Sequence, residues 1–249
     1  MVTTLRQIFL RLLIVLLFGA LSACIGPGGE NEPVRVNFDS RFDIRTQTPA
    51  YFSFSRAILS INSIRFQGIR QAGNDVAFST RPDLPVGVYV FTPSDFLKPV
   101  TWFDIPEGVY NSMRWEIILN PLDDDFGNDD DDAFSFEGYG FIIEGHYTRI
   151  DGTRVLMIFA LEEDELLRLQ TVDLQGQTTI TLIVDRQYSI ELLINPFNIM
   201  GGIPRSMLEQ AELDVENGYS YLLISPHNNE ELYNLMILRL AMELRAVIK

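Results

Sequence analysis

The segment Met113–Leu119 alternates side chains over a full strand length, and this period of two is the strongest constraint on the fold. Met113, Trp115, Ile117 and Leu119 fall on one face, and the residues between them fall on the other. Side chains of a β-strand point alternately to opposite faces of its sheet, so the apolar face of this strand needs a packed layer against it. The chain is therefore expected to build a β-sheet with a buried face.

Further segments carry strand signals and are separated by turns rich in Gly, Pro and Asp. Aromatic residues are abundant, with 17 Phe, 9 Tyr and 2 Trp, as is typical of β-rich proteins. Short strands at this spacing predict a mainly β fold, an antiparallel β-sandwich. The additional strand candidates are Val34–Phe38, Ala57–Phe66, Phe134–Tyr147, Arg154–Ala160, Thr178–Val184 and Tyr219–Ile224.

The last third of the chain predicts a few short helices packed on this sandwich. Ile203–Ala211 has a proline in its first turn. Asn228 or Asn229 can cap a second helix whose first turn holds Glu230 and Glu231. The side chains that this second helix would bury are Leu232, Leu235, Met236 and Leu240.

Two segments leave the secondary structure open. Leu161–Leu167 is compatible with a helical turn as well as with a strand. Residues 242–248 alternate apolar and charged side chains, which fits a final strand and a longer helix equally.

The N-terminus has the pattern of a secretory signal peptide over residues 1–23. Arg6 and Arg11 precede the apolar segment Leu12–Ala20, and small residues follow it up to Cys24. The ending Leu-Ser-Ala-Cys resembles the lipobox of bacterial lipoproteins. The resemblance implies that the Cys24 thiol receives a diacylglycerol and that its new amino group is acylated, as with palmitate. The alternative is an ordinary signal peptide with an incidental cysteine, although Cys24 is the single cysteine of the chain.

Residues 24–33 then form a flexible tether, because Gly, Pro and polar residues bury too little apolar surface to fold. Residues 34–249 are expected to form a single β-sandwich domain with a C-terminal helical extension. No aspartate follows the cysteine directly, which by resemblance to enteric lipoproteins indicates the outer membrane. We therefore expect a lipid-anchored protein of the bacterial cell envelope.

The charge of the chain limits its partners. Removal of residues 1–23 takes away two of the 19 basic residues and no acid, which leaves 17 minus 34, or −17. Such a surface repels nucleic acid and anionic lipid headgroups. The expected partners are the membrane, through lipidated Cys24, and a protein or glycan of the envelope, with no nucleic acid.

The segment Asp123–Asp132 holds seven aspartates in ten residues. Calcium prefers such oxygen ligands, and the candidate ligands are Asp123, Asp125, Asp129 and Asp131. The EF-hand pattern fits neither from Asp123, where position 5 is Gly127 and position 12 is Phe134, nor from Asp125, where position 3 is Gly127. The alternative is a solvated connection between two strands, in which like charges repel one another.

Motifs of catalysis are missing from the sequence. It has two histidines, His146 and His227, and neither a Gly-x-Ser-x-Gly nor a Ser-x-x-Lys motif. A pair of carboxylates acting on glycosides leaves no local pattern, so a hydrolase of that kind stays an alternative. Trp115 is expected in the core, whereas Trp102 is a candidate for stacking on a ligand. We expect no enzyme and no cofactor other than calcium.

Three segments resemble a group of uncharacterised lipoproteins, common in Bacteroidota, with a transthyretin-like β-sandwich. They are Ala57–Gly68, Asp104–Leu119 and Thr178–Leu193. The resemblance implies no catalytic residues. The expected function is thus a non-catalytic, lipid-anchored binding or structural module; the alternatives are a calcium-dependent adhesion module and a hydrolase with a carboxylate pair.

Overall fold

Fourteen strands and three helices make up the computed structural model, which describes residues 32–44, 49–81, 83–93, 97–123, 134–163, 165–216 and 219–249. The chain divides into two units, Met1–Glu32 and Pro33–Lys249. Cys24, the predicted lipidation site, lies outside the described residues. The strands are β1 Pro33–Phe42, β2 Phe52–Arg70, β3 Val76–Ser79, β4 Gly87–Phe91, β5 Lys98–Pro106, β6 Gly108–Leu119, β7 Tyr139–Thr148, β8 Arg154–Glu162, β9 Leu166–Val172, β10 Ile180–Leu182, β11 Tyr188–Ile194, β12 Asp214–Glu216, β13 Tyr219–Ile224 and β14 Arg245–Ile248; the helices are α2 Pro196–Met200, α3 Arg205–Gln210 and α4 Glu230–Glu243.

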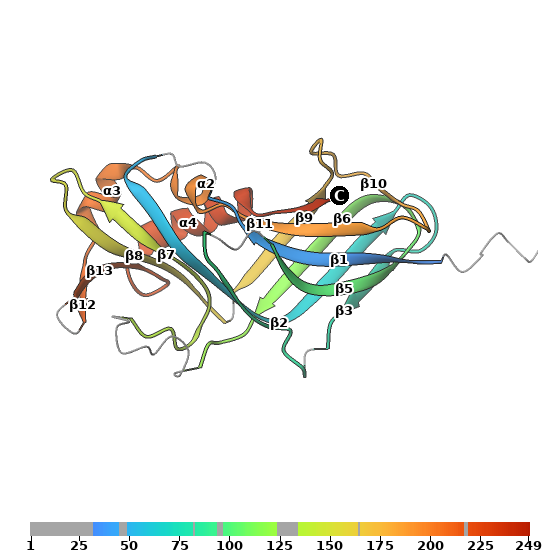
Figure 1. Cartoon of the computed structure of the whole chain (residues 1–249), viewed down its shortest axis with the longest axis horizontal. Helices are drawn as coiled ribbons and strands as arrows, with labels where there is room; N and C mark the ends of the chain where they lie inside the picture. Colours follow the sequence, from blue (N-terminus) through green and yellow to red (C-terminus); the bar gives the residue numbers. More distant parts are fainter. Residues whose placement is uncertain are drawn as a thin grey trace, which may run out of the picture. The chain divides into compact units, whose positions relative to one another are not determined.

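The strands form one curled, mixed sheet in the order β12-β13-β8-β7-β2-β6-β9-β14-β11-β1-β5, with β3 and β4 on β2 and β10 on β6 (Figure 1). The expectation of a mainly β protein is confirmed, but the antiparallel sandwich is not what the strands build. Three pairs run parallel, namely β1 with β11, β8 with β13 and β9 with β14. Alternation along a strand shows that one face is buried, but not whether a second sheet or the same curled sheet covers it.

The long strand β2 organises this sheet because each of its two edges pairs with two successive strands. Ala57 pairs with Phe91 of β4 and with Ile143 of β7, so these two strands lie on opposite edges. Further along β2, Arg65 pairs with β3 on one edge and with β6 on the other. The backbone carbonyl of Ser60 accepts a hydrogen bond from the N–H of Asn120, which directly follows β6. The carbonyl of Ile61 accepts from the N–H of Val86, which directly precedes β4. Strands β6 and β7 therefore pair one after the other along the same edge of β2, and residues 120–138 connect them.

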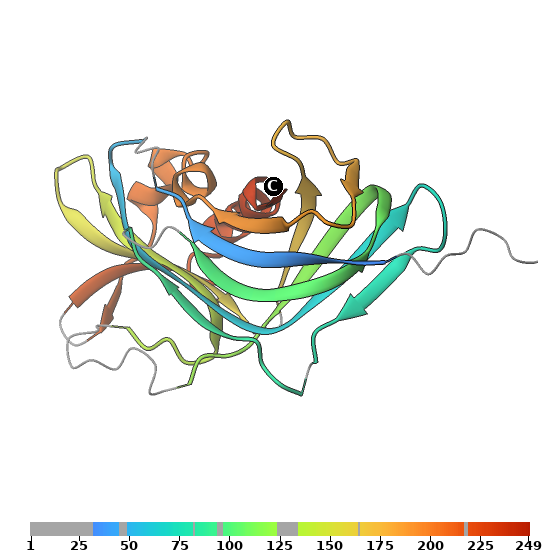
Figure 2. The ribbon, with the colours of Figure 1, turned by 45° about the vertical axis from the view of Figure 1, so that its right-hand side comes forward.

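An aromatic core fills the inside of the curl. The ring centroid of Trp115 lies 5.1 Å from Phe38, 4.6 Å from Phe66 and 5.0 Å from Phe103, which come from β1, β2 and β5. The sheet can therefore bring β1 and β5 round to face β2 and β6 without a second layer (Figure 2). The indole N–H of Trp115 donates to the Thr171 hydroxyl at 2.8 Å, and its side chain is buried, as predicted.

A second, smaller core lies on the outer face of the sheet, where residues 120–138 leave and rejoin the line of pairing. Leu122, Phe134 and Phe136 pack there against Ile58 and Ile142 of the sheet. The backbone N–H of Leu122 also donates to the carbonyl of Tyr139 at 3.0 Å. Both ends of the excursion that carries the aspartate run are thus held on the sheet, whereas residues 124–133 lie outside the described residues.

The C-terminal helices are present as predicted, and the open alternatives are settled. Helix α4 buries Leu232, Met236 and Leu240, and β14 follows it as a separate strand. The proposed helical turn at Leu161–Leu167 is wrong, because Leu167 pairs with Ile117 of β6 as part of β9. Among the described residues, none of the helices combines the length and the apolar character needed to cross a bilayer.

Candidate functional site

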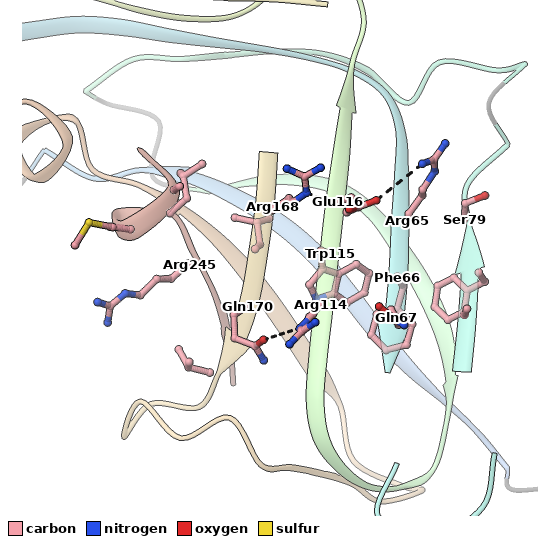
Figure 3. A pocket seen from close by; sticks show the side chains of 17 residues that line it. Arg65, Phe66, Gln67, Ser79, Arg114, Trp115, Glu116, Arg168, Gln170 and Arg245 are labelled. Carbon is pink, nitrogen blue, oxygen red and sulfur yellow. Dashed lines mark hydrogen bonds and ion pairs between the residues drawn. The ribbon is translucent and has the colours of Figure 1, made fainter. Parts of the chain in front are cut away.

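A trough with a volume of about 920 Å³ lies on the outer face of β2, β6 and β9 and reaches the C-terminal end of α4 (Figure 3). Its position follows from alternation along the strands. Phe66 and Trp115 point into the aromatic core, so their neighbours Arg65, Arg114 and Glu116 point to the opposite face. The same alternation along β9 presents Arg168 and Gln170 on this face.

The antiparallel register assembles these polar side chains into two rows across the strands. In the first row, Arg65 stands opposite Glu116, and Glu116 opposite Arg168. The guanidinium groups approach the carboxylate at 3.9 Å from Arg65 and 3.3 Å from Arg168. In the second row, Gln67 and Gln170 flank Arg114, whose Nε donates to Gln170 Oε1 at 3.4 Å.

The trough carries an excess of positive charge on an acidic chain. Among the residues that the structure describes, four arginines line it, since Arg245 of β14 adds to the three of the rows, and Glu116 is the one acid. The local charge is therefore 4 minus 1, or +3, whereas the whole chain carries −15. The ion pairs of Glu116 are largely exposed, and exposed pairs contribute little net stability. Both partner arginines keep donors for a ligand.

The floor and rim of the trough differ in character from its charged rows. Phe66 and Trp115 lie beneath the arginines and are almost fully buried, so their ring faces are not presented to a ligand. At the rim, Met242 of α4 is exposed, and Ala77 and Ser79 of β3 form the opposite border. Cationic side chains therefore dominate what a ligand meets first.

Trp102, the residue predicted to stack on a ligand, lies on β5 and does not line this trough. Its side chain is exposed, in keeping with that role. One ring face is already covered, because the Arg35 guanidinium lies 3.9 Å from the ring centroid and is held by Asp104 at 3.3 Å. The contact is a cation–π pair within the chain.

The predicted calcium ligands fall mostly outside the described residues. Asp123 is exposed at the beginning of the excursion, and Asp125, Asp129 and Asp131 lie in the part of it that is not described. Within the described ranges no three His, Cys, Asp or Glu side chains gather closely enough to share a metal ion. The calcium hypothesis stays a prediction.

The groups with catalytic potential lie on β7, on β12 and in the turn before α4. Burial raises the pKa of Asp214, whose oxygens accept from the Asn228 amide at 3.3 and 3.4 Å. His227 is exposed and places Nε2 3.2 Å from Glu162. Burial lowers the pKa of His146, which lies on β7. The structure pairs Asp214 with an amide, and the carboxylate-pair hydrolase stays an untested alternative.

Sequence reasoning missed the trough, although a signal for it is present. The pattern Arg, apolar, Gln or Glu occurs at residues 65–67, 114–116 and 168–170, in each case within a strand of alternating burial. Each copy alone reads as an ordinary exposed strand face. The sequence does not show that these three strands are neighbours in the sheet.

The function of this protein is inferred from the geometry of the arginine trough and from the sequence patterns at the N-terminus. The proposed likeness to envelope lipoproteins stays a prediction. No protein-family model, no curated protein and no solved structure matches the chain.

Proposed function

We propose that this protein is a non-catalytic, lipid-anchored binding module of the bacterial cell envelope, and that the arginine trough is its binding surface. The observation that carries the proposal is the gathering of four arginines and a single acid, Glu116, among the described lining residues of a trough of about 920 Å³, on a chain with a net charge of −15. Like-signed charges on one sheet face repel one another, so this arrangement lowers stability unless a ligand of opposite charge offsets it.

The geometry also suggests how the surface would work. A guanidinium presents a planar fork of donors that matches carboxylate or phosphate oxygens. The strands fix the Cα atoms of the arginines at defined spacings, and the guanidinium ends of the side chains stay exposed. A rigid sheet that presents several such forks suits recognition of an anionic partner.

The anchor belongs to the same proposal and is supported by the sequence alone. Several acyl chains on Cys24 would hold the protein at a membrane, since each buried methylene contributes about 0.8 kcal/mol. Residues 24–33 would then act as the tether between the membrane and the sheet. The absence of an aspartate directly after Cys24 supports an outer-membrane location, by resemblance to enteric lipoproteins.

Binding to a panel of probes tests the trough. The full-length protein in detergent would be titrated with an acidic peptide, an oligouronate, inorganic phosphate and a neutral oligosaccharide. We expect at least one anionic probe to bind, and its binding to be lost in the Arg114→Gln/Arg168→Gln variant. The control is Arg186→Gln, which removes an exposed arginine that does not line the trough. Binding that survives the double substitution would refute the assignment.

Substitution of Cys24 tests the anchor separately. In cells fed labelled palmitate, we expect label in the wild-type protein and none in Cys24→Ala, because the thiol is the site of lipid attachment. The wild-type protein should sediment with membranes. Label that remains in the variant would contradict lipidation at this position.

A further inference from the structure

We infer that the trough recognises an extended acidic polypeptide segment with carboxylates on alternate residues. This inference rests on the proposed function and names the class of partner. Arg114 is the first ground for it. Among the described residues, its side chain makes a long hydrogen bond of 3.4 Å to the neutral amide of Gln170, and no carboxylate pairs with it. Arg114 is exposed, and Figure 3 shows its side chain beside Gln170 on the trough face.

The spacing of the arginines is the second ground. The two rows are two residues apart along the strands, which is about 7 Å, and neighbouring strands are about 4.8 Å apart. The Cα of Arg114 therefore lies about 8 Å from those of Arg65 and Arg168. Alternate side chains of an extended peptide repeat at the same distance of about 7 Å. A peptide lying along the strands can thus place one carboxylate on Arg168 or Arg65. The carboxylate of the residue two positions further along the peptide then reaches Arg114.

The surroundings favour a peptide over a glycan. Sugar rings bind proteins by stacking on exposed aromatic faces, whereas Phe66 and Trp115 are 2% and 1% exposed. The third aromatic residue among the described lining residues, Phe78, is half-buried, and its ring stacks on Phe66 at 4.7 Å. The rim instead offers aliphatic area, since Met242 is 58% exposed; Leu238, one turn earlier on α4 and outside the lining, is equally exposed. An apolar residue of the peptide can be buried there.

The charge of the whole chain restricts the size of the ligand. Extended polyanions such as nucleic acid or an anionic membrane meet the negative field of the surface as a whole. At physiological salt this field is screened over about 8 Å, which is the scale of the trough itself. A short acidic segment therefore meets mainly the local charge of +3.

Glu116 provides a test of whether the acidic peptide binds beside this carboxylate. Its carboxylate holds Arg65 and Arg168 and repels an incoming acid. Replacement by glutamine removes both effects while the side chain keeps its size. The peptide should therefore bind Glu116→Gln more tightly than it binds the wild-type protein, by about tenfold, which corresponds to about 1.4 kcal/mol.

The experiment is a calorimetric titration of the full-length protein in detergent at physiological salt. The probe is a capped peptide in which aspartate alternates with threonine, and the matched probe has the same composition with its aspartates contiguous. We expect the alternating peptide to bind more tightly. We also expect about tenfold weaker binding to Arg114→Gln and no change for Arg186→Gln. Circular dichroism confirms that each variant is folded.

The outcomes separate this inference from the proposed function. If oligouronate or inorganic phosphate binds through Arg114 and neither peptide does, the trough remains a binding site but its peptide preference is wrong. Equal binding of the two peptides would also overturn the inference. Self-association of the free protein that Arg114→Gln abolishes would assign the trough to a second copy of the chain. If no probe binds, both the inference and the assigned surface fall.

Discussion

Trp115 connects the two faces of β6 at the scale of single residues. Its ring joins the aromatic core inside the curl, while its neighbours Arg114 and Glu116 stand in the trough on the other face. The hydrogen bond from its indole to Thr171 fixes β6 against β9, the strand that supplies Arg168. The position of the charged rows therefore depends on a buried side chain that no ligand touches.

We predict that Trp115→Ala lowers the free energy of unfolding by about 3–5 kcal/mol, because truncation leaves a large cavity in the aromatic core. Urea denaturation followed by circular dichroism measures the change. The matched control is Trp102→Ala, which removes an exposed ring and a cation–π contact and should cost about 0.5–1 kcal/mol. Equal losses for the two variants would contradict the assignment of Trp115 to the core.

The hydrogen bond of Trp115 can be tested on its own. Thr171→Val should cost about 1–3 kcal/mol, because it leaves a buried N–H without a partner. In a Trp115→Phe background the donor is already gone, so the same substitution should cost less. A double-mutant cycle that shows no coupling would count against this contact.

At the scale of elements, a carboxylate fastens helix α3 to the turn between β7 and β8. Glu209 of α3 accepts from the Tyr147 hydroxyl, from the backbone N–H of Ile150 at 2.9 Å and from Arg149 at 3.4 Å. Arg205, one turn earlier on the helix, donates to the carbonyl of Thr148 at 3.0 Å. A helix of six residues has few hydrogen bonds of its own, so these side-chain contacts hold it in place.

We predict that the hydrogen bonds to the Glu209 carboxylate make the stability of the protein fall in acid. The hydrogen bond from Tyr147, followed by those from Ile150 and Arg149, lowers the pKa of Glu209 below its ordinary value of 4.5. A lowered pKa in the folded state means that the stabilisation is present above pH 4.5 and is lost as the pH falls through the folded-state pKa. Thermal melts between neutral and acid pH should show this loss.

Variants identify the carboxyl group responsible. Glu209→Gln should have a lower melting temperature at neutral pH and a weaker decline in acid than the wild-type protein. Glu212→Gln, at an exposed glutamate nearby, should change neither quantity. An unchanged acid profile in Glu209→Gln would show that other groups cause the decline.

At the scale of the whole molecule, net charge dominates. The chain carries −15, and the aspartate run concentrates seven acids in ten residues. Self-repulsion of a surface far from neutrality destabilises the compact state, and salt screens it. The melting temperature should therefore rise with sodium chloride, independently of any specific site.

Calcium should raise the melting temperature beyond this general effect if Asp123, Asp125, Asp129 and Asp131 bind it. A ligand that binds the folded state alone stabilises by mass action, and 1 kcal/mol corresponds to about 2–4 °C for a chain of this size. Scanning calorimetry in calcium, in magnesium and in sodium chloride at matched ionic strength measures it. Replacement of Asp125, Asp129 and Asp131 by asparagine should abolish the calcium increment. An increment equal to that of sodium chloride would remove the calcium hypothesis.

The sequence by itself determined that this protein is mainly β, that strands such as β6 have a buried face, and that helices lie near the C-terminus. These properties follow from period and propensity within a short segment, as the alternation around Trp115 shows. The final strand and the break between β8 and β9 depended on neighbours and stayed open or were mistaken. Local patterns do not specify which strands pair or whether they run parallel.

Only the tertiary structure decided that one curled sheet, and not a sandwich, buries the apolar faces. It also decided that three separate Arg-apolar-Gln/Glu segments meet on one outer face. Arg65, Arg114 and Arg168 are far apart in the chain, and register alone sets arginine opposite glutamate or glutamine. The physical reason is that strand pairing joins residues distant in sequence, and a shift by one residue would turn these side chains to the opposite face.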